Sequence, residues 1–441
     1  MSEEVTKFGY KQELKREINW VDVLIYSLVF MVPIAPWGIY GIVASESGGM
    51  PSLAYLLGML GMMPTAYAYF LMVREFPLAG SVYNYAQRAV HPIFGFIAGV
   101  LILLDYFLVP GLVYVVAALA MNSLIPDIPY WLWILIFLIP MTTLSMLGIK
   151  PTARANKVLL AIELFALAAF IAYTLGYAIS NNLSFSLTPF YNQSTFNINT
   201  ILTATSVAVL SYLGFDAATT LAEEHRGKAT YVGRAVVLSV FLIGIFFITQ
   251  TYLAYITYPT YQFQDPSTGF YEVAQAVGGI ILLTITTLAT AISWGIGDGL
   301  VATTAIARVI YAMGRDGFLP KLVARVHPKY GTPWIATLLS GLISTIIAVS
   351  ISLDVLTSLV NFGALSAFIL MHVAAIYYFG YKNKKYLVTV PSIFGLLVLG
   401  FIWYGLDINA KILGFSWLVF WLIYTAILTR GFRKKVSLPS A

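Results

Sequence analysis

The chain has 441 residues, of which 59% are hydrophobic and only 10% are charged, and it contains no cysteine. A water-soluble domain of this length needs far more charge on its surface, so the composition excludes a soluble globular protein and indicates one that faces lipid. The lack of cysteine excludes disulfides and thiolate metal sites within this chain. In a membrane protein the distribution of the +6 net charge matters more than its sum, and we expect no nucleic-acid partner.

The N-terminal segment, residues 1–19, is polar and of mixed charge. The apolar stretch that follows it has no small-residue cleavage site before the next polar turn, so it is not a removable signal peptide. We therefore expect the first helix to remain in the mature protein.

The chain then contains about twelve apolar stretches that are long enough to cross a hydrocarbon core about 30 Å thick. Their predicted bounds are 20–46, 51–73, 92–121, 130–147, 155–179, 200–222, 232–257, 279–312, 333–351, 354–380, 386–405 and 411–429.

Charge supports this number of spans. If the N-terminus is cytoplasmic, every Lys and Arg of the chain except Lys411 falls in an inside segment or at an adjoining helix end. A missed helix would invert every later loop and scramble that alternation. The pattern therefore predicts a multi-pass protein of the plasma membrane with both termini in the cytoplasm.

Two of the spans are interrupted near mid-membrane. The first contains Pro33, Pro36 and Gly38, and prolines three residues apart disrupt a continuous helix. The sixth contains Gly214 within the stretch 211–216. Irregular backbone at this depth persists only where it lines a cavity in the protein, and matching breaks in two halves are the best sequence indication of a transporter's central site.

These breaks divide the chain into predicted parts. Spans 1 and 6 each open a group of five spans, and because five is odd the two groups have opposite topology. We expect a first repeat over 20–179, an extracellular loop over 180–199 and a second repeat over 200–380. Helices 11 and 12 follow over 381–429, and a cytoplasmic tail occupies 430–441.

Several motifs resemble those of the amino acid–polyamine–organocation transporter superfamily, and within it the putrescine importer-like branch. The longest is Ala307–Pro320, which continues to His327–Pro333. Shorter ones are Phe76–Tyr83, Leu104–Tyr106, Thr152–Asn156, Gly214–Asp216 through Glu223–Glu224, and Asn361–Leu365.

The resemblance implies an all-α LeuT-type fold: ten helices in an inverted repeat, two further helices, and alternating access around a midplane site. Substrate would lie between the two breaks, flanked by spans 3, 8 and 10. Besides the acids discussed below, the substrate-binding residues implied are Pro33, Ala35, Trp37, Gly38, Tyr106, Ser211, Tyr212, Gly214, Phe215 and Trp294. Amino acid carriers of the superfamily usually have a glycine-rich first break whose amides hold a carboxylate; here prolines and Trp37 stand there.

Four acids fall within spans, namely Asp105, Glu163, Asp216 and Asp298, whereas no Lys or Arg lies at comparable depth. A charge at the centre of a bilayer costs at least about 2.5–3.5 kcal/mol, so each acid needs a reason. A cationic substrate would supply the missing counter-charge, which indicates an amine ligand.

Each acid has a role and an alternative. Asp105 is expected to contact substrate or act in gating, the alternative being a protonated hydrogen-bonding group. Asp216 either contacts substrate or caps the second half-helix of span 6. Asp298, one turn after Trp294, either forms a cation-binding wall with that indole or makes a hydrogen bond inside the bundle.

By the family resemblance, many proton-coupled relatives carry a lysine at the position that matches Glu163, so this acid is a departure from their pattern. Desolvation of a lone acid could bring its titration near physiological pH. We hypothesise that Glu163 carries the coupling proton.

The sequence thus predicts a permease, not an enzyme, that imports an amino acid or polyamine by proton symport and works as one protomer without cofactor or metal. Exchange of substrates is the alternative. An intramembrane aspartyl protease would use Gly295-x-Gly297-Asp298, but the chain has no Pro-Ala-Leu sequence to accompany it. A channel would require repeated carbonyls or rings of charge, which single-copy acids do not provide.

Overall fold

The computed structural model describes residues 7–9, 13–124, 127–266, 268–350, 353–406 and 408–428. The predicted tail 430–441 and most of the predicted N-terminal segment before residue 13 lie outside these ranges. The side chains of some residues near 119–130 and 351–358 are likewise not described.

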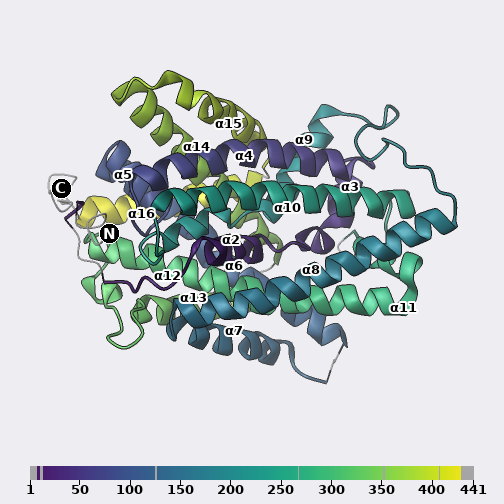
Figure 1. Cartoon of the computed structure of the whole chain (residues 1–441), viewed down its shortest axis with the longest axis horizontal. Coiled ribbons are helices and arrows are strands. Elements are labelled where there is room, and N and C mark those ends of the chain that lie inside the picture. The colour runs from purple at the N-terminus through teal and green to yellow at the C-terminus, as the bar shows by residue number, and fades with distance from the viewer. Residues whose placement is uncertain are drawn as a thin grey trace.

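The described residues form helices that run mainly along the long axis of one bundle (Figure 1). Ten helical segments are long and apolar enough to cross a membrane, and two shorter apolar helices cover 131–146 and 334–350. The uninterrupted spans are α4 (Pro51–Glu75), α6 (Pro92–Leu124), α7 (Tyr130–Met146), α8 (Ile149–Ser180), α10 (Ala229–Thr257), α13 (Trp334–Ser350), α15 (Tyr386–Tyr404) and α16 (Ile408–Leu428). The predicted all-α architecture with twelve spanning segments is confirmed in the described part of the chain.

The other spans are composite. The first consists of α2 (Trp20–Met31), η1 (Ala35–Gly38) and α3 (Tyr40–Glu46), and the sixth of α9 (Ile198–Ala208), η2 (Val209–Tyr212) and η3 (Phe215–Leu221). The eighth contains α11 (Gly269–Ile292), the π-helix η4 (Ser293–Asp298) and α12 (Gly299–Arg315), and the tenth α14 (Leu353–Ala375) and the π-helix η6 (Ile376–Lys382). Short helices α5 (Val82–Ala89) and η5 (Lys321–Ala324) lie between spans.

The two ends of the bundle differ in charge. The helix α5 and the segment 316–333 lie at one end, which we call the basic end because cations such as Arg88, Lys321 and Lys329 gather there (Figure 1). The helix α3 and the loop 181–197 lie at the opposite end. Polar segments therefore cap both ends of a long apolar body.

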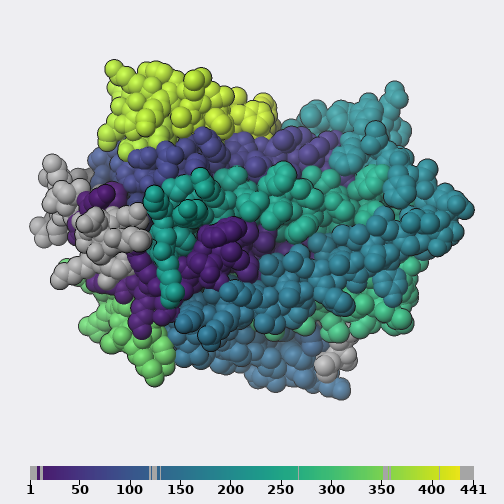
Figure 2. Space-filling view, viewed as in Figure 1, coloured from purple at the N-terminus to yellow at the C-terminus, as the bar shows by residue number. Residues whose placement is uncertain are grey.

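The outer helices present apolar side chains outward. On α15, Leu387, Leu397 and Phe401 are 88%, 59% and 63% exposed, and Figure 2 shows this helix standing out from the rest of the surface. Only lipid can cover such a surface without large cost, so the packing agrees with the composition.

The break in the first span begins at Val32, which has a φ of 48° after α2 ends. This conformation is costly for a β-branched residue and persists only because the surrounding structure holds it. The carbonyl of Pro33, freed from the helix, accepts a hydrogen bond of 3.0 Å from Nε2 of Gln250 on α10. A side chain of a neighbouring helix thus satisfies the backbone where lipid cannot.

The break in the sixth span depends on Gly214. Its φ of 110° lies in the region that favours glycine, and a Cβ built there would lie 2.6 Å from Cγ of Phe30. The broken backbone of span 6 therefore packs directly on the last turn of α2, which brings the two breaks together.

The eighth span differs from the prediction at one boundary. Helical residues begin at Gly269 rather than at 279, but Gly279 itself has φ 58° and ψ −152°, so residues 269–278 form a separate short helix. The membrane-spanning part of this segment therefore starts at residue 279, where the apolar pattern starts. The short helix 269–278 that precedes it lies at the end of the bundle opposite the basic end.

We expect Gly214→Ala to lower the stability of the protein by about 2 kcal/mol or more, because a side chain there is strained and collides with Phe30. Thermal unfolding of the purified protein in detergent measures this. Gly176→Ala on α8 is the matched control, because a Cβ there meets nothing within 4 Å and alanine favours a helix. Equal melting temperatures for the two variants would contradict the requirement for glycine.

Candidate functional site: an acidic cavity between two broken helices

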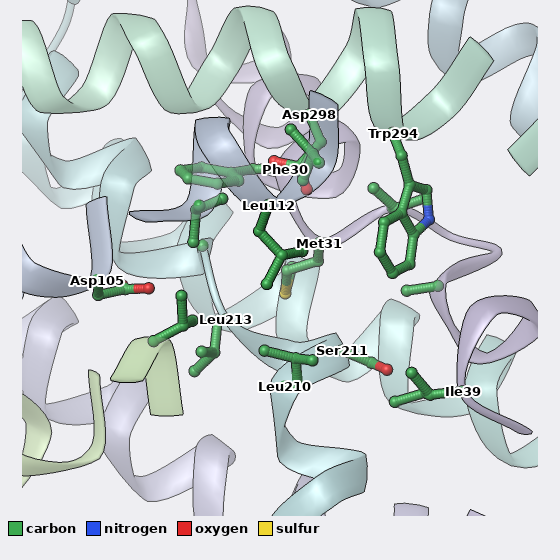
Figure 3. Close-up of a pocket in the computed structure, with 16 residues that line it drawn as sticks. Phe30, Met31, Ile39, Asp105, Leu112, Leu210, Ser211, Leu213, Trp294 and Asp298 are labelled. Atoms are coloured by element: carbon green, nitrogen blue, oxygen red, sulfur yellow. The ribbon is translucent and has the colours of Figure 1, made fainter. Parts of the chain in front are cut away.

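A cavity lies where the two breaks meet, near the middle of the bundle (Figure 3). It contains about 550 Å³ of space not filled by protein atoms. Its walls come from the end of α2, η1, α6, η2, η4 and α14. They are formed by Phe30, Met31, Val32, Ala35, Ile39, Asp105, Val109, Leu112, Val113, Leu210, Ser211, Leu213, Gly214, Trp294, Asp298 and Val360.

Two carboxylates face this otherwise apolar cavity. Asp105 on α6 is 1% exposed and Asp298 at the end of η4 is 8% exposed, and they approach from different helices (Figure 3). The Oδ1 atom of each has no hydrogen-bond partner among the described residues. Among the residues that the structure describes, no Lys, Arg or His lines the cavity. It therefore offers buried acceptors without a counter-charge from the protein, and such groups call for a ligand.

The indole of Trp294 forms one side of the cavity. A Cβ built on Gly38 would lie 2.9 Å from Cζ2 of this indole, so the ring can pack here only because residue 38 has no side chain. The Nε1 atom of Trp294 has no hydrogen-bond partner among the described residues. One turn of η4 thus supplies both an aromatic face and the carboxylate of Asp298, the combination that binds organic cations.

The expected substrate-binding residues divide into two groups. Those that line the cavity are Ala35, Asp105, Ser211, Gly214, Trp294 and Asp298. Those that lie outside its lining are Pro33, Trp37, Gly38, Tyr106, Tyr212, Phe215 and Asp216. Sequence reasoning did not single out lining residues such as Met31, Leu112 and Val360, which are ordinary apolar residues with no distinctive pattern.

Asp216 lies behind Phe30, at the start of η3. It accepts hydrogen bonds from the hydroxyls of Tyr106 and, at 3.2 Å, Ser81, which precedes α5. The rings of Phe30 and Tyr106 are 6.3 Å apart. This carboxylate therefore links η3 to α6 and to the residue before α5 at the basic end. It is not part of the cavity lining.

The other aromatic residues of the sixth break are packing groups in this conformation. Tyr212 donates a hydrogen bond of 2.8 Å to the carbonyl of Tyr55, and its ring meets Phe247 at 5.0 Å. Phe215 packs between Tyr69 and Phe368. These contacts hold η2 and η3 against α4, α10 and α14.

Aromatic rings close the cavity towards the opposite end. Trp37 stacks on Phe270 at 5.0 Å with an angle of 14° between the rings, and Phe170 packs against both. Beside them, a Cβ on Gly41 would lie 2.3 Å from the carbonyl oxygen of Pro266. The helix α3 therefore packs directly on the segment that leads into α11.

Ion pairs close the cavity towards the basic end. Arg308 on α12 and Glu224 after η3 are each 1% exposed and make a bidentate pair, with 3.1 Å between Nη2 and Oε2. Two turns further along α12, Arg315 forms an ion pair with Glu223 at 3.1 Å. Glu223 also accepts a hydrogen bond of 2.8 Å from the amide of Ala79. We call these two pairs the ionic lock, because they join span 6 to span 8.

An N-terminal strap, residues 13–19, lies across this lock. The amide of Glu17 donates to the carbonyl of Glu224 at 3.0 Å, and the amide of Arg226 donates to the carbonyl of Ile18 at 2.8 Å. The hydroxyl of Tyr311 on α12 donates to Glu13 at 3.2 Å. The strap therefore binds both elements that the lock joins, the segment after η3 and the helix α12.

Sequence reasoning placed the members of the lock but missed their pairing. The available signal was two adjacent acids directly after the broken sixth helix, together with two arginines seven residues apart on one face of a helix. Which acid meets which arginine depends on how the helices pack.

Glu163 lies apart from the cavity, at the junction of α8, α2 and η4. It is 1% exposed, and neither of its carboxylate oxygens has a hydrogen-bond partner among the described residues. A Cβ on Gly297 would lie 3.3 Å from its Oε1 and 3.3 Å from Val29. Gly297 precedes Asp298, so the helical turn that carries a cavity acid also touches Glu163.

Comparison with known proteins assigns this chain to a family. The sequence model of the family described as "Amino acid permease" matches residues 23–435. The chain belongs to that family. It is therefore a multi-pass membrane protein that transports a small molecule, and its relatives are named as transporters or permeases rather than enzymes.

Three relatives illustrate the range of the family. The low-affinity putrescine importer PlaP of Escherichia coli (strain K12) is 30% identical over 455 aligned positions, covering 99% of this chain and 98% of that protein. The branched-chain amino acid permease BcaP of Bacillus subtilis (strain 168) is 25% identical over 83% of this chain and 81% of its own. A methylthioribose transporter of the same Bacillus strain is 27% identical over the same shares.

Glu224→Gln should weaken the closure at the basic end, because it leaves Arg308 buried without a charged partner, which costs about 3–5 kcal/mol. Since the natural chain has no cysteine, Ala218→Cys provides one reactive site in η3, where the side chain is fully buried. We expect Glu224→Gln to speed maleimide labelling of this cysteine in the purified protein at least about tenfold.

The control for this experiment is Glu75→Gln, which removes a pair between Arg74 and Glu75 whose side chains are 42% and 32% exposed. Exposed pairs contribute only about 0–1 kcal/mol, so labelling should stay at the background rate. Equal labelling rates in the two variants would show that the buried pair does not hold the basic end closed.

Proposed function

We propose that this transporter imports a small solute bearing a cationic amine, a di- or polyamine before an amino acid, by proton symport. The observation that carries the proposal is the pair of carboxylates, Asp105 and Asp298, which face an apolar cavity whose described lining contains no cationic side chain. Buried charges are retained where they are paired. An ammonium group of the substrate pairs them, and the indole of Trp294 adds a face that attracts cations.

The first break offers little for a substrate carboxylate. Pro33 and Pro36 have no amide hydrogen. The amides of Ala35, Trp37 and Ile39 donate to the carbonyls of residues 32, 34 and 36 within the break itself. Five positions of the break, residues 33, 35, 36, 37 and 39, therefore offer no free amide to an α-carboxylate, which favours an amine without a carboxylate.

The names of the relatives agree with this choice without deciding it. One is a putrescine importer and another a branched-chain amino acid permease. Since family membership covers both chemistries, the substrate class is argued from the cavity of this chain.

The proposed orientation places the basic end in the cytoplasm and the protein in the plasma membrane. Lys and Arg residues near the ends of spans stay on the cytoplasmic side. The aromatic closure around Trp37 would then face outward and the ionic lock inward. The halves 20–179 and 200–380 would move against each other as two repeats, opening one closure at a time around the cavity.

Glu163 is the proposed carrier of the coupling proton. It is buried, has no hydrogen-bond partner among the described residues, and touches the turn that carries Asp298. Asn156 lies seven residues earlier on the same face of α8, about 10 Å nearer the basic end, and is fully buried with no partner for its amide. Buried polar groups of this kind bind ordered water, which would give protons a path to Glu163.

Uptake into proteoliposomes tests the substrate class. With an inside-alkaline pH gradient, we expect radiolabelled putrescine to accumulate and to compete better than a panel of amino acids. Asp105→Asn and Asp298→Asn should each reduce putrescine affinity about tenfold or more, because each removes a charge-assisted contact. Asp127→Asn, in an exposed loop, is the control and should transport normally. Accumulation of amino acids with no effect of putrescine would reject the amine.

Glu163→Gln tests the coupling. The variant should lose gradient-driven accumulation but keep exchange of internal for external substrate, since exchange needs no net proton movement. Both rates are measured in the same vesicles with and without a pH gradient. If Glu163→Gln still concentrates substrate, another group carries the proton; if the wild type only exchanges, the protein is an antiporter.

A further inference from the structure

A second hollow, separate from the cavity, runs along the outside of the bundle between α6, α12, α13 and α16. Every residue that lines it is apolar, and it contains about 970 Å³ of space not filled by protein atoms. Phe107 lies on the α6 side, Ile310 on α12 and Ile343 on α13, while Trp417 and Trp421 form the wall on α16. We call it the apolar groove.

The groove extends from the basic end towards the middle of the membrane. Pro320 and Val323 close it at the basic end, beside η5. On α13 its lining runs from Leu339 to Ile347, about 12 Å along the helix. One leaflet of the hydrocarbon core is about 15 Å thick, so the groove covers most of a single leaflet.

A cation flanks the end of the groove that meets the membrane surface. Lys321 is the first residue of η5, is exposed, and directly follows Pro320, which lines the groove. Lys321 makes no ion pair with a carboxylate among the described residues. Deeper in, Nε1 of Trp421 is shielded from solvent and has no hydrogen-bond partner in the described part of the chain.

We propose that this groove binds one acyl chain of an anionic phospholipid from the leaflet at the basic end, with the phosphate held by Lys321. Lipid tails are as apolar as leucine, so the groove alone gives no preference over the bulk bilayer. Selectivity must come from the head group, and a cation near the surface contributes about fivefold towards an anionic lipid.

A second copy of the chain is a poorer occupant. Helices that associate in membranes approach through small residues or interhelical hydrogen bonds. The walls here are instead large side chains around a concave surface, such as Phe107, Ile343 and Trp417. A slender flexible chain fills such a shape, whereas a helix is about 10 Å wide.

The position of the groove connects it to the moving parts. Leu104 lines the groove and is the neighbour of Asp105, which faces the cavity from the same helix. Ile310 lines it two residues after Arg308 of the ionic lock. A bound chain would therefore fill the space behind the helices that carry both groups.

Native mass spectrometry of the full chain, released from micelles that contain equal amounts of phosphatidylglycerol and phosphatidylcholine, tests the proposal. The wild type should retain one phosphatidylglycerol in preference to phosphatidylcholine. Ile343→Trp should lose it by filling the groove, whereas Leu342→Trp should keep it, because Leu342 is 60% exposed and lies outside the groove. Lys321→Gln should weaken retention about fivefold and Lys228→Gln should not.

If Ile343→Trp fails to fold, a second measurement on the protein without that substitution still tests the proposal. In vesicles, phosphatidylglycerol with brominated chains should quench tryptophan fluorescence at a lower mole fraction than brominated phosphatidylcholine, and replacing both Trp417 and Trp421 by Phe should remove that difference. Equal retention or quenching by the two lipids would overturn the proposal. So would a dimer that Ile343→Trp dissociates, since a second copy would then occupy the groove.

Discussion

The structure depends on one constraint: backbone groups freed from a helix inside a membrane must find partners within the protein. Two helices are broken at mid-depth, and each break is held by a specific contact. Gln250 supplies a donor for the carbonyl of Pro33, and Gly214 allows the other break to lie against Phe30. Because each break needs surrounding protein, the two lie face to face at the centre of the bundle. The cavity and its acids follow from that placement.

The two closures around the cavity use different chemistry. Towards the opposite end, stacked rings around Trp37 exclude water by packing alone, and their contacts can re-form in several arrangements. At the basic end, Arg308 and Glu224 are buried, and a buried pair is demanding in geometry because both charges have lost their water. We infer that the aromatic side tolerates varied ligand shapes, whereas the ionic side switches between two defined states.

Most of the fold was predictable because lipid imposes a simple rule on length and polarity. The predicted start of span 8 at residue 279 coincides with the non-helical Gly279, although the short helix before it was not foreseen. The site was harder. Asp105, Trp294 and Asp298 line the cavity. A broken helix, however, loses its regular rotation from one residue to the next, so sequence spacing could not decide that Trp37 packs on Phe270 and Tyr212 against α4. Pairing across helices, as between Arg308 and Glu224, needs the packing itself.

The N-terminal strap has a consequence for how the protein is made. Ile18 pairs with a stretch of backbone at 225–226, and Glu13 with Tyr311, so the strap binds partners synthesised some 200 to 300 residues later. Glu223 and Glu224 are also made before their arginines, so the ionic lock can form only once α12 has been made. A chain that stops short of that point would lack both this closure and Asp298, and Asp105 would have neither its partner acid nor a sealed basic end.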